Sequence, residues 1–374
     1  MDENIETDWY TIEDIDAIDS PALVVYPERV RENINKLVSM IDDVKRLRPH
    51  VKTHKSKEVT ALIRNAGVTK FKCATIAEAE MLAMSGATDI LLAYQPSLPK
   101  VRRFISLIKK CPASVFSCLV DNKESAKIIA DALTKNNLKL RVYVDVNVGM
   151  NRTGIQIGSE VAALYKYCDS LDGIIPIGLH VYDGHIRKSN FEERKSECDE
   201  AFEPVLKIQK QLTEEGFAEP VIVAGGSPTF PIHAKREKVE CSPGTFIFWD
   251  YSYQSQLTEQ PFLTAALVIT RVISFPSDGK LCLDLGHKSI AAENEPGKRV
   301  HFLNAPALKF VSQSEEHLVV EAEGGHHYKI GDVFYGLPYH ICPTVALYER
   351  AITVENKKIS GEWRIIARDR KITI

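Results

Sequence analysis

Short apolar runs alternate with amphipathic segments of helical period from residue 20 to about residue 230, and few folds accommodate this alternation. Short runs separated by helical segments are typical of βα units, whose strands pair in parallel. The number of runs predicts a TIM-type (β/α)8 barrel, although a doubly wound open sheet stays open because periodicity does not show closure. The runs are Ala22–Tyr26, Leu47–Lys52, Phe71–Thr75, Ile90–Tyr94, Ser114–Val120, Leu140–Asn147, Ile174–Val181 and Val221–Ala224.

The pattern changes after about residue 255. Segments such as TAALVITRVISF, KLCLDLG and EWRIIARDR alternate with the period of two that is typical of strands, and turn residues separate them. We therefore predict two domains. The barrel covers residues 18–255, and a second, mostly β domain combines residues 1–17 with residues 256–374.

Composition narrows the class of protein. The hydrophobic share of 44% and the charged share of 26% are ordinary for a globular chain. The net charge of -3, from 47 basic and 50 acidic residues, argues against a nucleic-acid partner. The eight cysteines form no CxxC pair, the N-terminus lacks the pattern of a signal peptide, and no apolar run is long enough for a membrane span. We expect a cytoplasmic protein that does not enter a membrane.

The octapeptide RPHVKTHK, at the end of the second run, carries the first candidate residues. In an extended segment, side chains repeat every two residues, so His50, Lys52 and His54 are expected on one face. Catalytic residues of barrels lie at the C-terminal ends of strands. A lysine among imidazoles and a second ammonium is a competent Schiff-base nucleophile when the barrel interior disfavours its charge. A solvated basic turn is the alternative.

Small-residue turns follow several of the later runs. The segments Ala224–Thr229 and Ser242–Thr245 expose backbone N–H groups and hydroxyls that can bind a phosphate. The segment Gly178–His185 adds His185, and imidazole titrates near neutrality, so His54 and His185 are candidate general bases. A role in shaping the pocket is the alternative for both histidines.

The motif LPYHICPT lies in the predicted β domain. His340 and Cys342 are two residues apart, which in an extended chain places an imidazole beside a thiol, a pair suited to zinc. Two protein ligands are too few for a closed structural site, so the other positions would be open to water or substrate. A core cysteine beside a histidine is the alternative.

Together these motifs resemble the fold-type III pyridoxal-phosphate enzymes, the alanine-racemase-like barrels, and among them the D-threonine aldolases and D-serine dehydratases. The resemblance extends from Asp19–Leu23 to Trp363–Arg368, and RPHVKTHK is its most specific part. It implies that Lys52 holds pyridoxal phosphate as a Schiff base, and that Arg152 faces the phenolic oxygen of the cofactor. It also implies that Tyr182 contributes an aromatic ring to the pocket, where a core aromatic is the alternative.

The same resemblance assigns the phosphate and the metal. The phosphate-binding turns of that family correspond in this chain to Gly226, Ser227, Gly244 and Thr245. His340 and Cys342 correspond to the residues that hold a divalent metal near the β-hydroxyl of the substrate; zinc is expected, with manganese or magnesium as alternatives. The family further implies a homodimer.

The resemblance leaves the reaction open. Some aldolases of the family have an aspartate where this chain has Cys342, whereas cysteine is typical of the zinc-dependent dehydratases. The segments PTVALYE and WRIIARDR look more like an aldolase. We expect a lyase that cleaves a D-3-hydroxy amino acid to glycine and an aldehyde. The alternatives are a dehydratase, then an amino acid racemase, and, from a different class, a non-catalytic pyridoxal-phosphate carrier.

Overall fold

The computed structural model describes residues 9–322 and 327–374. These residues form two compact units, and each is described by itself. The first consists of Ile34–Gly244, Gln256–Pro261 and Asp369–Ile374. The second consists of Thr245–Ser255, Phe262–Arg368 and the described part of Met1–Asn33. The domain limits predicted from the sequence, 18–255 against 1–17 with 256–374, stay a prediction, and residues 1–8 lie outside the described part.

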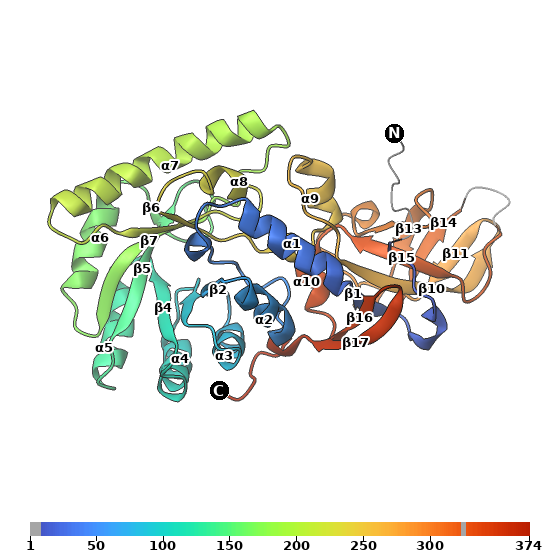
Figure 1. The fold of residues 1–374 in the computed structure, drawn as a ribbon, viewed down its shortest axis with the longest axis horizontal. Helices are drawn as coiled ribbons and strands as arrows, with labels where there is room; N and C mark the ends of the chain where they lie inside the picture. Colours follow the sequence, from blue (N-terminus) through green and yellow to red (C-terminus); the bar gives the residue numbers. More distant parts are fainter. Residues whose placement is uncertain (1–8, 323–326) are drawn as a thin grey trace. The chain divides into compact units, whose positions relative to one another are not determined.

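Parallel strands form the sheet of the first unit, in the order β2-β3-β4-β5-β7-β8-β9 (Figure 1). Their bounds are β2 Lys70–Cys73, β3 Asp89–Leu92, β4 Val115–Val120, β5 Leu140–Asn147, β7 Ile174–Val181, β8 Val221–Ala224 and β9 Val239–Cys241. The short strand β6, Ile155–Gln156, pairs with β5 off this path. Every neighbouring pair is parallel, as the βα pattern predicts.

The sheet closes through residues 47–51. Leu47 pairs in parallel with Cys241 of β9, and His50 pairs in parallel with Lys72 of β2. The backbone N–H of Arg48 donates to the carbonyl of Cys241 at 2.8 Å. This segment therefore serves as the barrel's first strand, and the expected barrel is confirmed over the open sheet.

Two strands differ from the sequence-based expectation. The run Ala22–Tyr26 forms β1, Ala22–Val25, which pairs with β10 and β16 in the second unit and is not a barrel strand. The barrel strand that the sequence analysis missed is β9, a three-residue strand with Glu240 in its middle. A charge in so short a segment hid the strand pattern.

Helices lie outside the curled sheet (Figure 1). They are α2 Lys57–Asn65, α3 Ile76–Met84, α4 Leu98–Lys110, α5 Lys123–Thr134, α6 Ser159–Asp169, α7 Phe191–Glu214 and α8 Phe230–His233. Several begin at a side chain that accepts a backbone N–H, as Ser56 does for α2, Thr75 for α3 and Asn122 for α5. Such caps fix where each helix starts after its strand or turn. The division between the units falls inside two further helices, α1 Pro27–Ser39 and α9 Tyr251–Gln256.

Buried charges lie inside the barrel. The guanidinium of Arg48 pairs with Asp89 at 2.6 Å and with Glu240 at 2.7 Å, and its side chain is 1% exposed. Lys70 also pairs with Glu240. A buried charge is tolerated when it is paired and hydrogen-bonded, so these contacts link the closing segment to strands on both of its sides.

A nine-stranded sheet forms most of the second unit, in the order β13-β14-β11-β10-β1-β16-β17, with β15 pairing β10 and β12. Its strands after β1 are β10 Ala266–Ser277, β11 Lys280–Leu283, β12 Val300–Phe302, β13 Lys309–Gln313, β14 Leu318–Glu321, β15 Val333–Pro338, β16 Arg350–Glu355 and β17 Lys358–Arg364. The short helix α10, Ile341–Val345, follows β15. Apart from the parallel pair β1–β16, these strands are antiparallel. The expected mostly β domain is confirmed.

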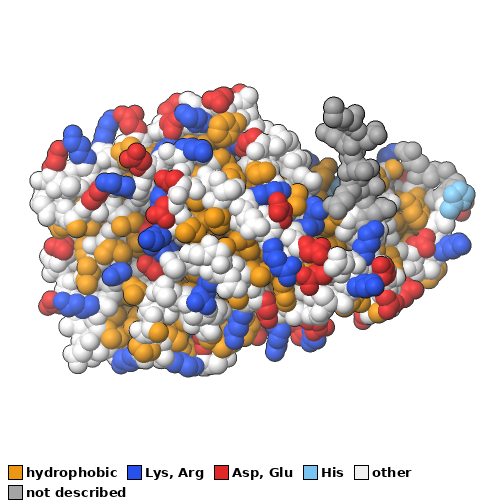
Figure 2. Space-filling model, viewed as in Figure 1, with side chains coloured by type: hydrophobic (Ala, Val, Ile, Leu, Met, Phe, Trp, Pro, Cys, Tyr) orange, Lys and Arg blue, Asp and Glu red, His pale blue; other side chains and the backbone are white. Residues whose placement is uncertain are grey.

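The surface carries both signs of charge. Lysine and arginine side chains alternate with aspartate and glutamate over the face shown in Figure 2. Within the described residues, no helix combines the length and the apolar character needed to cross a membrane.

We predict that Arg48→Met lowers the free energy of unfolding by about 3–5 kcal/mol, because it leaves Asp89 without its partner and weakens the pairing of buried Glu240. Urea denaturation followed by circular dichroism measures this change. The control is Lys127→Met, which removes an exposed pair with Asp131 and should change stability by less than about 0.5 kcal/mol. Equal effects of the two substitutions would contradict the role given to Arg48.

Candidate active site

The chain turns immediately after the closing segment, and Lys52 lies in this turn. The N–H of Lys55 donates to the carbonyl of Val51 at 2.9 Å, and the N–H of Lys52 donates to Nδ1 of His50 at 3.1 Å. The expectation that His50, Lys52 and His54 share one face of an extended strand is therefore wrong, because the backbone leaves the extended conformation after His50. Lys52 is half-buried at the C-terminal end of this barrel strand.

His54 points into the protein. It is 1% exposed, and its Nδ1 accepts the N–H of Ser56 at 3.2 Å, so the ring proton is on Nε2. Burial lowers the pKa of His54 to about 3. These surroundings do not favour His54 as a general base at neutral pH.

Tyr182 follows β7 and lies among cations and glycines. The guanidinium carbon of Arg152 is 4.9 Å from the centroid of its ring. A Cβ atom added to Gly184 would lie 2.4 Å from ring atoms, and one added to Gly226 would lie 3.3 Å from the ring. Small residues at these two positions therefore make room for the aromatic ring.

The small-residue turns after β8 and β9 lie together. The N–H of Gly244 donates to Oγ of Ser227 at 3.3 Å, which links one turn to the other. A Cβ added to Gly244 would lie 3.1 Å from the carbonyl oxygen of His50. Among the described residues, the buried hydroxyl of Ser242 finds no hydrogen-bond partner. These groups form the kind of N–H and hydroxyl cradle that binds a phosphate.

A histidine that the sequence analysis missed lies near this end of the barrel. Nδ1 of His180, on β7, is 2.7 Å from Oδ1 of Asp145, on β5. Burial lowers the pKa of His180, with Lys72 and Arg152 acting in the same direction. Although burial opposes it, the hydrogen bond from His180 helps to lower the pKa of Asp145. The imidazole is therefore neutral with its proton on Nδ1, donating to the carboxylate.

The other ring nitrogen of His180 is available. Its Nε2 is buried and has no hydrogen-bond partner within the part of the chain that the structure describes. The signal that could have found this residue is the period of two along β7, which places His180 and Tyr182 on one face.

Lys72 was also missed. It is the third residue of β2, is 2% exposed, and its Nζ lies 5.8 Å from the centroid of the Tyr182 ring. A lysine at the carboxyl end of a barrel strand is the signal that could have marked it.

His185 occupies a different place from His180. Its side chain is exposed, and its Nε2 would lie 2.6 Å from a Cβ atom added to Gly149, in the turn after β5. Gly149 has a φ of +123°, which also disfavours any larger residue. The structure thus brings His185 to the turn that precedes Arg152.

Three buried side chains of the first unit have the spacing of metal ligands: Asp183, Cys198 and His233 offer ligand atoms within 4.8 Å of one another. Nε2 of His233 is 2.8 Å from Oδ2 of Asp183. The guanidinium of Arg236 contacts Nδ1 of the same ring and can only donate, so the ring proton is on Nε2. A protonated Nε2 does not bind a metal, so this geometry favours a hydrogen-bonded network.

The network supports the turn after β8. Oγ1 of Thr229 donates to Oδ1 of Asp183 at 2.8 Å and accepts the N–H of Gly226 at 3.3 Å. Burial raises the pKa of Cys198 to about 12, which keeps it a thiol.

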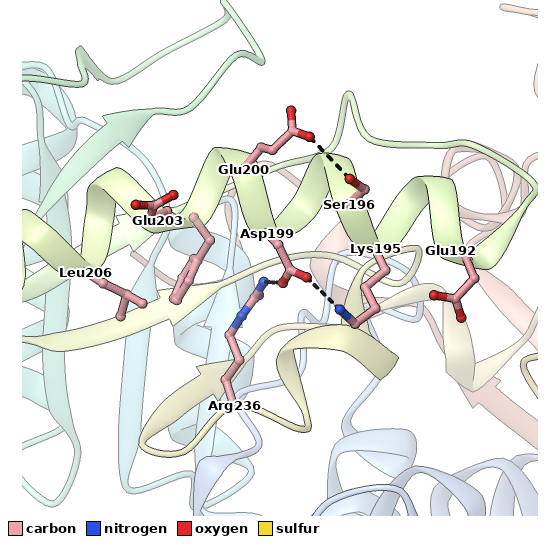
Figure 3. Close-up of a pocket in the computed structure, with 9 residues that line it drawn as sticks. Glu192, Lys195, Ser196, Asp199, Glu200, Glu203, Leu206 and Arg236 are labelled. Atoms are coloured by element: carbon pink, nitrogen blue, oxygen red, sulfur yellow. Dashed lines mark hydrogen bonds and ion pairs between the residues drawn. The ribbon is translucent and has the colours of Figure 1, made fainter.

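A surface hollow along α7 lies beyond this network (Figure 3). Arg236 and Lys195 both contact Asp199, the latter at 2.8 Å, and Ser196 donates to Glu200 at 3.2 Å. The residues that line this hollow do not include the predicted site residues. Both of its basic groups, Lys195 and Arg236, pair with Asp199, and we assign it no ligand.

His340 and Cys342 lie in the second unit, at the start of α10. Glu293 contacts Nδ1 of His340, and Oγ1 of Thr245 is 3.6 Å from Sγ of Cys342. Thr245, which belongs to the same unit, thus contacts the predicted metal ligand Cys342. Although burial opposes protonation, Cys342, Asp250 and Glu293 raise the pKa of His340 to about 9. A divalent ion would displace the protons of this imidazole and thiol on binding, and the resulting imidazole and thiolate are suitable donors for zinc, so these residues fit a divalent metal.

The barrel residues likewise fit pyridoxal phosphate. A half-buried lysine stands at the end of a barrel strand, and the linked turns after β8 and β9 offer N–H groups and hydroxyls. The free polar atoms of Ser242 and His180 are buried and need a ligand or solvent to satisfy them.

Known proteins match both parts of the chain. The model described as "Alanine racemase, N-terminal domain" matches residues 25–252, and "Putative serine dehydratase domain" matches residues 265–354. A D-threonine aldolase of Arthrobacter sp. is 27% identical over 94% of this chain and 93% of its own.

Solved structures share the fold. That of a D-threonine aldolase from Filomicrobium marinum has a TM-score of 0.87 at 23% identity, covering 96% of this chain and 98% of its own. A cysteine-to-alanine mutant of a D-threo-3-hydroxyaspartate dehydratase, described as the metal-free form, has a TM-score of 0.81 at 22% identity, covering 93% and 97%.

Proposed function

We propose that this chain, which belongs to the family that joins an alanine racemase N-terminal domain to a serine dehydratase domain, is a D-threonine-aldolase-type lyase. This is a family of pyridoxal-phosphate-dependent aldolases and dehydratases of D-hydroxy amino acids. The proposed substrate is a D-3-hydroxy amino acid, cleaved to glycine and an aldehyde. The observation that carries this proposal is the interacting pair His340 and Cys342, held by Glu293 and Thr245. A racemase or a non-catalytic cofactor carrier has no evident need for two side chains that bind a metal ion.

Lys52 is proposed to hold the cofactor, which when bound supplies a sink for the electrons released at Cα. The turns with Gly226, Ser227 and Gly244, continued by Thr245, would bind its phosphate. Arg152 and Tyr182 would contact its ring.

His340 and Cys342 are proposed to hold the divalent metal, which when bound supplies a Lewis acid for the β-hydroxyl. Zinc suits an imidazole and a thiolate best, with manganese or magnesium as alternatives. The metal-free form of the dehydratase mutant supports metal dependence among similar proteins.

A base must accept the hydroxyl proton for aldol cleavage. The sequence suggested His54 and His185; the neutral ring of His180, with a free Nε2, is a further candidate. In the dehydratase alternative, Lys52 removes the α proton and hydroxide departs. We further propose a homodimer, which the resemblance to the family implies. We also propose a location in the cytoplasm, because the eight free cysteines suit a reducing compartment.

The first test concerns Lys52. Borohydride should trap the reduced cofactor on the peptide that contains Lys52, and Lys52→Ala should abolish the adduct, because the other half-buried amine of this turn, Lys55, is paired with Glu78. Mass spectrometry of the digested protein identifies the peptide. Lys57→Ala is the control and should keep the adduct. An adduct on Lys55 or Lys72 in the wild-type protein would overturn the assignment.

The second test separates the two groups that have the spacing of metal ligands. Cys342→Ser should lose the bound divalent ion and at least about 90% of the activity, whereas Cys198→Ser should keep both, since Cys198 belongs to a hydrogen-bonded network. Elemental analysis of the purified proteins measures the ion. Chelation of the wild-type protein should remove the ion while the unfolding temperature of the barrel changes little. Loss of metal from Cys198→Ser alone would reverse the assignment.

The third test separates the two reactions. D-Threonine should give glycine and acetaldehyde, because the metal and a base act on the β-hydroxyl proton and the Cα–Cβ bond breaks. Chromatography of the products distinguishes this from 2-oxobutyrate and ammonia, which a dehydratase would form. L-Threonine should give neither, since its substituents are presented to the wrong sides of the site. 2-Oxobutyrate as the main product would establish the dehydratase, and equal turnover of both enantiomers would exclude both.

A further inference from the structure

Lys72 differs from two neighbouring cations of the barrel, buried Arg48 and half-buried Lys70. Arg48 contacts Asp89 and Glu240, and Lys70, two residues before Lys72 on the same strand, contacts Glu240. Within residues 9–322 and 327–374, the structure shows neither a hydrogen bond nor an ion pair to the ammonium of Lys72, which is 2% exposed. Burial of an unpaired ammonium is unfavourable, so such a group either releases its proton or meets an anion that the chain itself does not supply.

The side chain of Lys72 points toward the end of the barrel that carries the candidate site. Its Nζ lies over the ring of Tyr182, the ring that Arg152 also contacts. Burial lowers the pKa of Lys72 to about 7, and the neighbouring charge of Lys52 acts in the same direction. Near neutral pH the ammonium and the amine are therefore both populated. Other charged and titratable groups that act on this lysine, or on which it acts, are Arg48, His50, Asp145, His180 and Asp183.

The position of Lys72 bears on which of two anions it binds, the phosphate of the cofactor or the carboxylate of the substrate. The phosphate cradle lies at the turns after β8 and β9, where Ser227 and Gly244 meet. The segment 47–51 separates β9 from β2, which carries Lys72. Asp145 and Asp183, whose charges act on Lys72, lie within the last part of β5 and two residues after β7. The described interactions of Lys72 thus involve Lys52 and the ring of Tyr182, and none of them involves Ser227 or Gly244 of the cradle.

We propose that Lys72 binds the α-carboxylate of the amino acid substrate and so selects amino acids over other primary amines. This inference rests on the proposed function, because it assumes that an amino acid reacts at Lys52. Lys72 then needs no acidic partner from the chain itself, because the carboxylate of the substrate supplies the negative charge. Substrate binding should then be accompanied by proton uptake, because a carboxylate beside Lys72 favours its charged form.

The test compares two ligands that differ only in this charge. D-Alanine has a carboxylate but no β-hydroxyl, so it can undergo neither cleavage nor dehydration; D-alaninamide replaces the carboxylate with a neutral amide. Each is titrated into the cofactor-loaded protein, and the change in cofactor absorbance gives Kd. At pH 7 the wild-type protein should bind D-alanine about 10–100-fold more tightly than the amide, as expected for a charged hydrogen bond.

Lys72→Met should weaken the binding of D-alanine until the two ligands differ by less than about threefold, while the Kd of the amide stays unchanged. The matched control is Lys70→Met, which removes a lysine from the same face of β2 and should keep the preference. Lys72→Arg is the second variant, in case the methionine variant does not fold. It should keep the preference up to pH 9, whereas the wild-type preference should decline as the pH rises above about 7, since only the charged lysine binds the carboxylate.

Other outcomes are distinguishable. If the wild-type protein prefers the carboxylate and Lys72→Met keeps that preference, the assignment of Lys72 is wrong while the proposed function stands. If Lys72→Met loses affinity for pyridoxal phosphate itself but keeps the preference, Lys72 serves the phosphate and the assignment is again wrong. If neither ligand changes the absorbance of the wild-type protein, the proposed function fails, and the inference fails with it.

Discussion

The barrel depends on the pairing of residues 47–51 with β9 on one side and β2 on the other. This segment is short, and its buried guanidinium, Arg48, contacts Asp89 and Glu240 from two other strands. Because a buried charge that loses its partner is strongly unfavourable, these pairs oppose any opening of the sheet at this seam. The closing segment also ends in the turn that carries Lys52. The same pairing that closes the barrel therefore decides where the proposed Schiff-base lysine lies.

The apolar pattern was sufficient to predict a barrel, but not which strands form it. The run at β1 has the composition of any buried strand, and only its pairing with β10 and β16, more than 200 residues away in sequence, excludes it from the barrel. The strand β9 was missed because Glu240 interrupts it, and this charge is tolerated only because Arg48 and Lys70 pair with it. Both errors arise from contacts between distant segments, which periodicity does not contain.

Prediction of the site residues was limited in the same way, by contacts between distant segments. Lys52, Tyr182 and the glycine turns follow from motifs, and the structure gives them consistent positions at the ends of barrel strands. The predicted face of His50, Lys52 and His54 failed because a tight turn replaces the extended backbone. Strand position alone could have marked Lys72 and His180 as candidates, but their states could not be predicted, because the proton position of His180 depends on Asp145 of another strand and the neighbours of Lys72 come from other strands.

The state of His180 bears on the choice between the two reactions. Asp145 accepts the proton of Nδ1, so the neutral ring presents only a lone pair at Nε2. A group in this state can accept a hydroxyl proton, which aldol cleavage requires. Departure of hydroxide would instead rely on the proposed metal as Lewis acid or on a proton donor, and a neutral ring with its only proton held by a carboxylate donates poorly, so this state of His180 would assist only the cleavage. Asp145→Asn, which removes the charge that fixes this tautomer, should therefore reduce glycine formation far more than cofactor binding. Glycine formation and cofactor absorbance, measured on the same preparation, test this, and an unchanged rate would exclude His180 as the acceptor.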